Sequence, residues 1–546
     1  MNVEIKDPVA EMQARDLSKR LAPDEAFVNI LYYTREKDNA RCYAAIVLRN
    51  GAEVPRFVDL GVAEPPEHGG SRTPKGKASG PGNPQQIVVA ASGKGSRDAI
   101  PFTEETSMIL SAPQSIEDAV KLWRYAVTHN GLELAGRGES RELEIGREKP
   151  SKEPARAREN ILTQAQQYLQ GRVLVPIWQA LGLPNNTNTS SSGKVADGGV
   201  TSSSAEKMGA AVRRLWVCPD GELARVPLHV LIDEFSGGAV MACEVDSPRE
   251  LVALRAAANE PAQPSDKLLL AAVRDFGGRA SRLNNTLTEI EKIEKLAAAP
   301  NLGLSAIPLK ESDATRDAVL RVLKEGKVGY AHIATHGFAG EELRKMNAGA
   351  ARQRDKAVAS AAGGSRFNEK NEGRSNVQPD SQTRTLRLIA RDSSGGVDHM
   401  YVARSPLLDS GLLLALPADA QAKKKDEADK DPGVVTAEDL VGLNLTGCNL
   451  VTLSACETGL GEGKTGQGIL GLRSAIMGAG SRAILMSLWK VDDPATAVLM
   501  KHFYTNLWAK GMQPAEALRQ AQIEVRKRWP DPQYWAAWVL VGQGWK

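Results

Sequence analysis

The sequence predicts an α/β fold in which a mostly parallel β-sheet is flanked by helices, and three features support this prediction. From Lys267 onward, short apolar segments alternate with amphipathic helical ones. The apolar segments are hydrophobic on both faces, as strands covered by helices on both sides must be. Long stretches rich in Gly, Ser, Pro and charged residues interrupt the alternation, so we expect long flexible insertions between the regular elements.

Composition narrows the class of protein. The chain has 546 residues, which at about 150 residues per domain corresponds to three or four domain-sized units, or fewer with large insertions. Hydrophobic residues make up 42% and charged residues 25%, which excludes a fibrous or wholly disordered chain. The net charge of +3 gives no reason to expect nucleic acid or a membrane surface as the partner.

The lack of a visible targeting signal and the few, scattered cysteines favour a cytoplasmic location. No segment approaches the ~18 consecutive apolar residues of a membrane span, and the first residues lack a basic segment followed by an apolar one. The five cysteines are scattered and odd in number, so they predict neither a disulfide framework nor a zinc site. We therefore expect a cytoplasmic protein with no metal and no cofactor.

The N-terminal half begins with an amphipathic pattern, followed by β-rich apolar runs typical of a meander. Ser115, with Glu117 and Asp118 in the next turn, forms a capping box that opens a helix. A longer helical pattern stops at Gly182 and Pro184. The expected elements are a helix over 8–22, strands over Ala26–Tyr33, Cys42–Leu48 and Arg56–Leu60, helices over Ser115–His129 and Ala157–Leu181, and a strand over Arg214–Cys218.

The C-terminal half carries the alternating strands and helices, after a boundary near 260–266. The expected strands are Lys267–Val273, Ala306–Leu309, Gly329–Ala334, Asn449–Leu453 and Arg482–Leu488. The expected helices are Asn285–Ala298, Ala314–Lys324, Gly468–Ala479, Pro494–Ala509 and Pro514–Lys527.

Low-complexity stretches separate these elements. Residues 64–96, 185–205 and 340–385 contain too little apolar surface to offset the entropy of ordering them. We expect them to be poorly packed and to be the first sites of limited proteolysis. The insertion over 340–433 is either an activation loop that the protein itself cleaves or a neutral surface loop.

Two expected strands end in reactive side chains. In Tyr330–Gly337, His336 follows the apolar part, and in Leu450–Gly459 the same is true of Cys456. The carboxyl ends of parallel strands line the ligand crevice of an open sheet, so the two side chains can meet there. A nearby imidazole lowers the pKa of a thiol and later protonates the leaving amine. The N–H groups of Gly337 and Cys456 would then face the developing oxyanion.

Simpler interpretations apply to the neighbouring residues. We expect His332, in the interior of its strand, to be a core or supporting histidine. Cys218, Cys243 and Cys448 lie in apolar contexts and are expected to be inert buried thiols. Taken alone, Cys456 could be a buried thiol as well.

The segment after Cys456 resembles a phosphate-binding loop only at its end. Gly463-Lys464-Thr465 matches the last residues of that motif, but Thr458 stands where its first glycine is required. A flexible loop leading into the next helix is the preferred interpretation, and an NTPase switch is disfavoured.

In combination, AHIATHGF, LVTLSACETGLG and ILMSLWKVDDPATAVLMKHFY resemble the CHAT domain, a relative of caspases, separases and gingipains. LWVCPDGELARVPLHVLIDE and SPRELVALR are similar to its N-terminal half, so the resemblance covers roughly residues 16–546. It implies a caspase-like fold with a His336–Cys456 dyad. It also implies a helical lead-in over 1–25, a degenerate caspase-like half over 26–265 and a catalytic half over 266–546.

The same resemblance suggests a specificity residue. Leu488–Asp493 is similar to a separase segment in which an aspartate binds the basic residue before the scissile bond, and that aspartate corresponds to Asp493. A carboxylate in a partly dry pocket, Asp493 or its neighbour Asp492, holds a guanidinium by a charge-assisted pair. Trp489 would wall this pocket. Alternatively, Asp492 or Asp493 caps the helix that begins at Pro494.

The sequence therefore predicts a cysteine endopeptidase that cleaves protein or peptide substrates after Arg or Lys, with a possible regulatory protein partner. The alternative is a catalytically silent scaffold of the CHAT type that binds a partner protein.

Overall fold

A computed structural model describes residues 15–63, 112–128, 153–183, 211–257, 265–325, 327–339, 386–391, 397–403, 410–417, 432–455, 462–464 and 468–545. The chain divides into two compact units. Unit 1 comprises Met1–Tyr33, Tyr43–Leu60 and Gln170–Lys546, and unit 2 comprises Thr34–Cys42 and Gly61–Leu169. The expected insertions at 64–96, 185–205 and 340–385 lie outside the described residues, and so does most of the expected helix over 8–22, of which 15–20 is helical.

A large sheet organises the described chain. Its eleven strands follow in the spatial order β3, β2, β1, β4, β5, β18, β17, β14, β8, β6 and β7. Their bounds in that order are Arg56–Val62, Ala40–Arg49, Glu25–Arg35, Arg214–Cys218, Met241–Glu244, Trp538–Gly542, Ala483–Ser487, Leu450–Ser454, Val328–Ala334, Lys267–Ala272 and Ser305–Lys310. The expected strands are all present, and the structure adds β5 and β18, whose short apolar runs gave no periodic signal.

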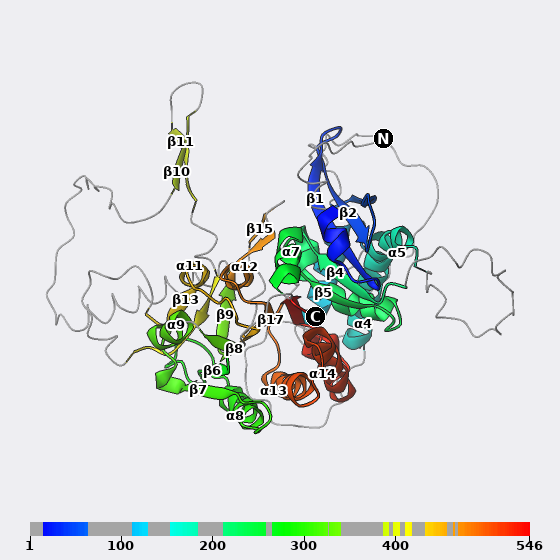
Figure 1. Ribbon diagram of the computed structural model, residues 1–546. Coiled ribbons are helices and arrows are strands. Elements are labelled where there is room, and N and C mark those ends of the chain that lie inside the picture. The colour runs from blue at the N-terminus through cyan, green and yellow to red at the C-terminus, as the bar shows by residue number, and fades with distance from the viewer. Residues whose placement is uncertain are drawn as a thin grey trace, which may run out of the picture. The chain divides into compact units, whose positions relative to one another are not determined.

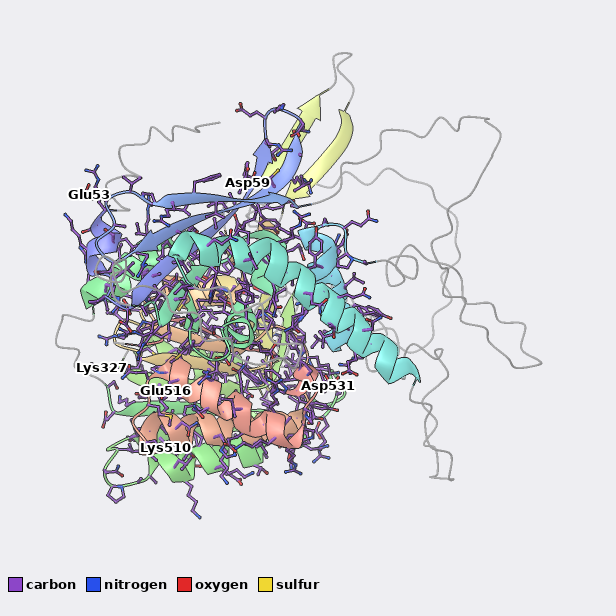
Figure 2. All side chains as sticks on the ribbon, turned by 90° about the vertical axis from the view of Figure 1, so that its right-hand side faces the viewer. Glu53, Asp59, Lys327, Lys510, Glu516 and Asp531 are labelled. Atoms are coloured by element: carbon purple, nitrogen blue, oxygen red, sulfur yellow. The ribbon has the colours of Figure 1, made fainter. Side chains whose placement is uncertain are left out.

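The sheet is mostly parallel, as predicted, and two sets of parallel strands meet at an antiparallel pair. β4, β5 and β18 run parallel to one another, and β17, β14, β8, β6 and β7 form a second parallel set. β17 and β18, which join the two sets, are antiparallel. The carboxyl ends of β8 and β14 therefore lie at the opposite edge of the sheet from those of β4 and β5. In Figure 2, the label of Lys327 marks the side of the sheet on which β8 begins. Asp531, which precedes β18, is labelled on the opposite side.

Helices cover both faces of the second parallel set (Figure 1). α8, α13 and α14 pack side by side on one face, while α11 and α12 pack together with α9 on the other. Right-handed crossovers between parallel strands place α8 on one face and α9, α11 and α12 on the other, because the chain reverses direction across the sheet after β7. The bounds are α8 Thr286–Ala297, α9 Arg316–Lys324, α11 Ala437–Val441, α12 Leu472–Gly478, α13 Asp493–Tyr504 and α14 Pro514–Arg528.

Unit 1 has further described helices. They are η2 Gln170–Leu174, α5 Val175–Leu181, η4 Gly221–Arg225, α6 Leu228–Phe235, α7 Pro248–Ala257, η5 Glu311–Asp313, η8 Thr505–Ala509 and η9 Pro532–Tyr534. Of these, η2 and η8 are π-helical segments that continue α4 and α13. In the described ranges, no helix combines the length and apolar character needed to cross a bilayer.

Among the described residues of unit 2, α3 (Ile116–Thr128) and α4 (Glu153–Leu169) pack against each other. The predicted N-cap of α3 is confirmed, because the backbone N–H of Asp118 donates to Ser115 Oγ at 3.1 Å. The hydroxyl of Tyr168 on α4 donates to the Gln114 carbonyl at 2.9 Å and so ties α4 to the start of α3.

Three small sheets complete the described structure: β9 (His336–Ala339), β12 (Ser410–Leu413) and β13 (Val434–Thr436); β10 (Leu386–Arg391) with β11 (Val397–Ala403); and β15 (Glu462–Lys464) with β16 (Gly468–Leu470). The predicted helix over Gly468–Ala479 is wrong in its first turn. Gly468 opens a strand and Gly471 is extended, because glycine gains little from helical geometry, so α12 starts only at Leu472.

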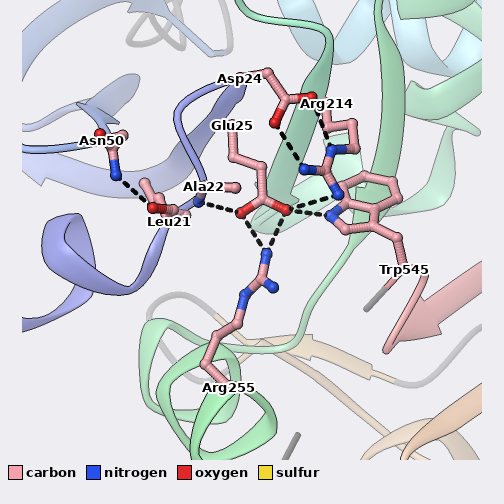
Figure 3. A network of polar contacts seen from close by, with 8 residues as sticks. All are labelled: Leu21, Ala22, Asp24, Glu25, Asn50, Arg214, Arg255 and Trp545. Carbon is pink, nitrogen blue, oxygen red and sulfur yellow. Dashed lines mark hydrogen bonds and ion pairs between the residues drawn. The ribbon is translucent and has the colours of Figure 1, made fainter. Parts of the chain in front are cut away.

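A buried carboxylate joins the start of the first strand to the end of the chain (Figure 3). Glu25 is 0% exposed and forms a two-oxygen ion pair with Arg255. It also accepts hydrogen bonds from Trp545 Nε1 at 2.6 Å and from the backbone N–H of Ala22 at 2.7 Å. Because each donor comes from a different element, this one side chain fixes the N-terminal strand, α7 and the C-terminal segment together.

Candidate functional site

The two strands with reactive ends are neighbours, as predicted. β8 and β14 pair in parallel, with Ala334 opposite Ser454. One residue further, the Thr335 N–H donates to the Ser454 carbonyl at 3.1 Å. His336 and Cys456 each follow this paired end by two residues. The structure describes β14 and its continuation as far as Ala455, so Cys456 itself lies outside the described residues.

His336 lies where the chain leaves the large sheet. β8 ends at Ala334, and β9 begins at His336 and pairs antiparallel with β12, with His336 opposite Leu413 and Gly337 opposite Leu412. The imidazole is 8% exposed, and its ring lies 4.8 Å from that of Phe276. A change of partner strand at this point turns the histidine toward the segment that follows β6.

A backbone carbonyl determines which nitrogen of His336 carries the proton. His336 Nε2 lies 2.7 Å from the Ser281 carbonyl oxygen and 3.5 Å from Ser281 Oγ. A carbonyl oxygen only accepts, so Nε2 is the protonated donor. In a neutral imidazole the lone pair then resides on Nδ1, which is the nitrogen able to take a proton.

The peptide group that leads into Cys456 is held from β17. Ser487, the last residue of β17, is fully buried, and its hydroxyl donates to the Ala455 carbonyl at 2.8 Å. Ser487 therefore holds the peptide carbonyl that directly precedes Cys456.

Asp492 and Asp493, which follow β17, have different hydrogen-bond partners. Asp492 is the N-cap of α13 and accepts from the Ala495 N–H at 2.9 Å. Asp493 is the first residue of that helix, and its Oδ2 accepts from the backbone N–H and the side-chain Nδ2 of Asn285 at 2.8 and 2.9 Å. No described residue bonds to Asp493 Oδ1. Of the two roles left open by the sequence, capping thus belongs to Asp492, and Asp493 reaches across to the start of α8.

Trp489 is completely buried, and its Nε1 donates to the Gln533 carbonyl at 3.1 Å. This bond ties the turn between β17 and α13 to η9. Its role as a pocket wall stays a prediction.

A buried chain of polar groups links the two site strands beneath this edge. His332 on β8 places Nε2 2.7 Å from Glu289 Oε1 and Nδ1 3.0 Å from the Tyr504 hydroxyl. That hydroxyl lies 2.8 Å from Thr452 Oγ1 on β14. The expected core location of His332 is confirmed, because it is 0% exposed. Burial raises the pKa of Tyr504 above its ordinary value, which keeps the hydroxyl protonated as a donor to His332.

A second buried polar cluster anchors α12, the first described helix after Cys456. Arg473 is 3% exposed and forms ion pairs with Asp246 and with Glu244 at 3.1 Å. Glu250 accepts from the backbone N–H of Asp246 at 2.5 Å. Two carboxyl groups thus share one guanidinium, with Glu250 close by. Burial raises the pKa of both Glu244 and Glu250 to about 7. Within the described ranges, no group of His, Cys, Asp or Glu is arranged to hold a metal ion.

The four described cysteines are all buried thiols: Cys42, Cys218, Cys243 and Cys448. Burial raises the pKa of Cys218 and Cys243, and that of Cys448 to about 11. This confirms the expectation of inert buried thiols at these three positions.

Sequence reasoning missed Ser281, Asn285 and Ser487. The first two lie in a Gly-rich segment directly after the carboxyl end of β6, which is a position that could have signalled a site. Ser487 is a small polar residue ending an apolar strand, and nothing local distinguishes it from a turn residue.

Comparison with known proteins identifies a family. Residues 200–543, more than half of the chain, match the family model described as the CHAT domain. The expected resemblance over 16–546 is thereby confirmed for this range.

Individual relatives match over a shorter range. Tetratricopeptide repeat protein 28 of Mus musculus is 31% identical over 111 residues, and that of Homo sapiens is 30% identical over 111 residues. Each alignment covers 20% of this chain and only 4% of the relative.

Solved structures were also found. The Arg-specific cysteine proteinase gingipain R has a TM-score of 0.35 and 9% identity, over 62% of this chain and 65% of its own. Separase of Saccharomyces cerevisiae, in complex with securin, has a TM-score of 0.45 and 9% identity, over 97% of this chain and 30% of its own.

Proposed function

Because this chain belongs to the CHAT domain family, we propose that it is a cysteine endopeptidase in which His336 is the general base and Cys456 the nucleophile. The observation that carries the proposal is the hydrogen bond from His336 Nε2 to the Ser281 carbonyl at 2.7 Å. It fixes the tautomer whose Nδ1 can accept the thiol proton, on a strand adjacent to the one that leads into Cys456.

The chemistry proceeds in two halves. His336 Nδ1 takes the proton of Cys456 Sγ, and the thiolate attacks the scissile carbonyl carbon to form a tetrahedral intermediate. The intermediate collapses as His336 returns the proton to the leaving amine, which leaves a thioester on Cys456. Water then gives a proton to His336 and attacks the thioester, and the thiol and the free carboxylic acid are released.

The oxyanion of the tetrahedral intermediate would be bound by the N–H groups of Gly337 and Cys456. Ser487 supports this role, because its hydroxyl holds the carbonyl of Ala455, the last described residue before Cys456. Preorganised donors of this kind contribute about 3–4 kcal/mol each to the stabilisation of the transition state.

Asp493 would recognise Arg or Lys before the scissile bond. Its Oδ2 is engaged by Asn285, which leaves Oδ1 as the oxygen for a bound cation. A single oxygen pairs with the ammonium of Lys as well as with one N–H of Arg, so we expect both residues to be accepted.

Fluorogenic peptides with different residues before the scissile bond test the proposal. Cys456→Ala and His336→Ala should each lose cleavage, while Cys448→Ala, which removes a buried thiol, should keep it. Asp493→Asn should lose activity on Arg and Lys peptides by ~100-fold or more. Its matched control, Asp492→Ala, should keep the preference and cost only ~1 kcal/mol of stability as a lost cap.

Alkylation provides a second measurement. With four buried cysteines, iodoacetamide should modify Cys456 much faster than the others, and His336→Ala should slow that reaction. No turnover by the wild type, together with equal and slow labelling of all cysteines, would favour the scaffold alternative. A protein or peptide substrate and a regulatory protein partner remain part of the proposal, as does a cytoplasmic location.

A further inference from the structure

One short segment contacts both halves of the proposed site. Between β6 and α8, the Ser281 carbonyl accepts from His336 Nε2 at 2.7 Å. Four residues later, Asn285 donates twice to Asp493 Oδ2, through its backbone N–H at 2.8 Å and its side-chain Nδ2 at 2.9 Å. The Leu283 N–H donates to the Arg274 carbonyl at 3.0 Å and closes the loop from which the segment extends.

The side chain of Asn285 is used in an unusual way. Asn285 is the N-cap residue of α8, and asparagine at that position ordinarily accepts from its own helix. Here it makes no side-chain cap, and its amide instead donates across to Asp493 at the start of α13. The Asn285 side chain thus links the start of α8 to the start of α13 instead of capping α8.

We propose that Asn285 is a positioning residue that couples the carboxylate for the basic substrate residue to the orientation of His336. The inference rests on the proposed peptidase function and adds a residue to it. Asn285 touches neither His336 nor the reacting atoms. It acts by holding one end of the Ser281–Asn285 segment, whose other end supplies the carbonyl that orients the imidazole.

The coupling has a calculable consequence for turnover. Without the Asn285 amide, the backbone N–H of Asn285 is the remaining bond to Asp493, so the Ser281 carbonyl is held less firmly. A displacement of about 1 Å at a catalytic group costs up to ~100-fold in rate. We therefore expect Asn285→Ala to lower kcat by ~10- to 100-fold, while the preference for Arg and Lys persists because Asp493 is intact.

Asp493→Asn should show the reverse pattern. The amide oxygen of an asparagine still accepts both bonds from Asn285, so the segment keeps its anchor, while the negative charge that attracts a basic residue is lost. This variant should lose the preference for Arg and Lys and keep the His336–Ser281 bond. Asn284→Ala is the matched control, because Asn284 is the adjacent, exposed asparagine.

A proton resonance reports the bond independently of activity. The His336 Nε2 proton, bound to a carbonyl oxygen, should give a downfield ¹H NMR signal in the full-length protein, assigned by its absence in His336→Gln. We expect this signal in the wild type, Asn284→Ala and Asp493→Asn. In Asn285→Ala it should move upfield or broaden by exchange with water, together with the loss of kcat.

The outcomes distinguish a failure of the role given to Asn285 from a failure of the proposed peptidase function. An unchanged signal in Asn285→Ala would overturn the role of Asn285 whether or not the protein cleaves peptides. The absence of cleavage by the wild type would overturn the proposed function, and the resonance would still decide whether Asn285 holds the Ser281 carbonyl in place. Circular dichroism melts of each variant exclude unfolding as the cause of a lost signal.

Discussion

Replacing Tyr504 with phenylalanine removes one hydroxyl from the buried chain that joins β8 to β14. That hydroxyl lies 3.0 Å from His332 Nδ1 and 2.8 Å from Thr452 Oγ1. Glu289 accepts from His332 Nε2, so Nδ1 accepts from Tyr504, and the Tyr504 oxygen in turn accepts from Thr452. All of these side chains are 0–2% exposed.

The expected cost follows from the two polar groups left behind. Without the hydroxyl, His332 Nδ1 and Thr452 Oγ1 are buried without a partner, at about 1–3 kcal/mol each. We expect Tyr504→Phe to lower the free energy of unfolding by ~2–4 kcal/mol, because the Thr452 hydroxyl can rotate to relieve part of its loss. Tyr534→Phe is the control, since Tyr534 is only half-buried, and it should change the free energy by less than ~0.5 kcal/mol.

Urea unfolding of a double-mutant cycle with Thr452→Val measures the coupling. Alone, Thr452→Val should cost ~1 kcal/mol. In the Tyr504→Phe background it should be close to neutral, because the threonine hydroxyl has already lost its partner, which gives a coupling of ~1 kcal/mol or more. Additive costs, or a Tyr504→Phe effect equal to that of Tyr534→Phe, would refute the hydrogen-bond chain.

Three further predictions concern other parts of the chain. Glu25→Gln should lower the free energy of unfolding in urea by ~3 kcal/mol or more, because the mostly buried guanidinium of Arg255 loses the charge of Glu25. The exposed Glu53→Gln should change it by less than ~0.5 kcal/mol, and equal effects would contradict the network in Figure 3. Glu244 has a pKa of about 7 in the folded protein against 4.5 when unperturbed, so the folded state holds its proton longer and stability falls as the pH rises from 4.5 to 7. Glu244→Gln should flatten that fall in urea titrations at pH 5, 6 and 7, and an unchanged slope would assign it to other groups. Ser487→Ala should lower kcat more than KM for a cleavable peptide, because it releases the Ala455 peptide that leads into Cys456; a change in KM alone would count against this role.

Much of the fold was predictable because its signals are local. Apolar runs bounded by turn residues identified the strands of the second parallel set, and Ser115 marked the start of α3. The reversal between β17 and β18 was not predictable, since the direction of a strand depends on which distant strand it pairs with. The helix expected over Gly468–Ala479 failed because two glycines favoured a strand and an extended turn over a helical start.

In the candidate site, too, local features were predictable from the sequence and long-range contacts were not. The sequence by itself determined that His336 and the residues before Cys456 end adjacent parallel strands, because strand periodicity and small residues at strand ends are written in the chain. Only the tertiary structure decided that the Ser281 carbonyl selects the tautomer of His336, that Asn285 rather than a cation holds one oxygen of Asp493, and that Ser487 orients the peptide before Cys456. Each of these contacts joins residues more than 30 positions apart through one hydrogen bond, and a hydrogen bond depends on atomic position and direction rather than on residue type or periodicity.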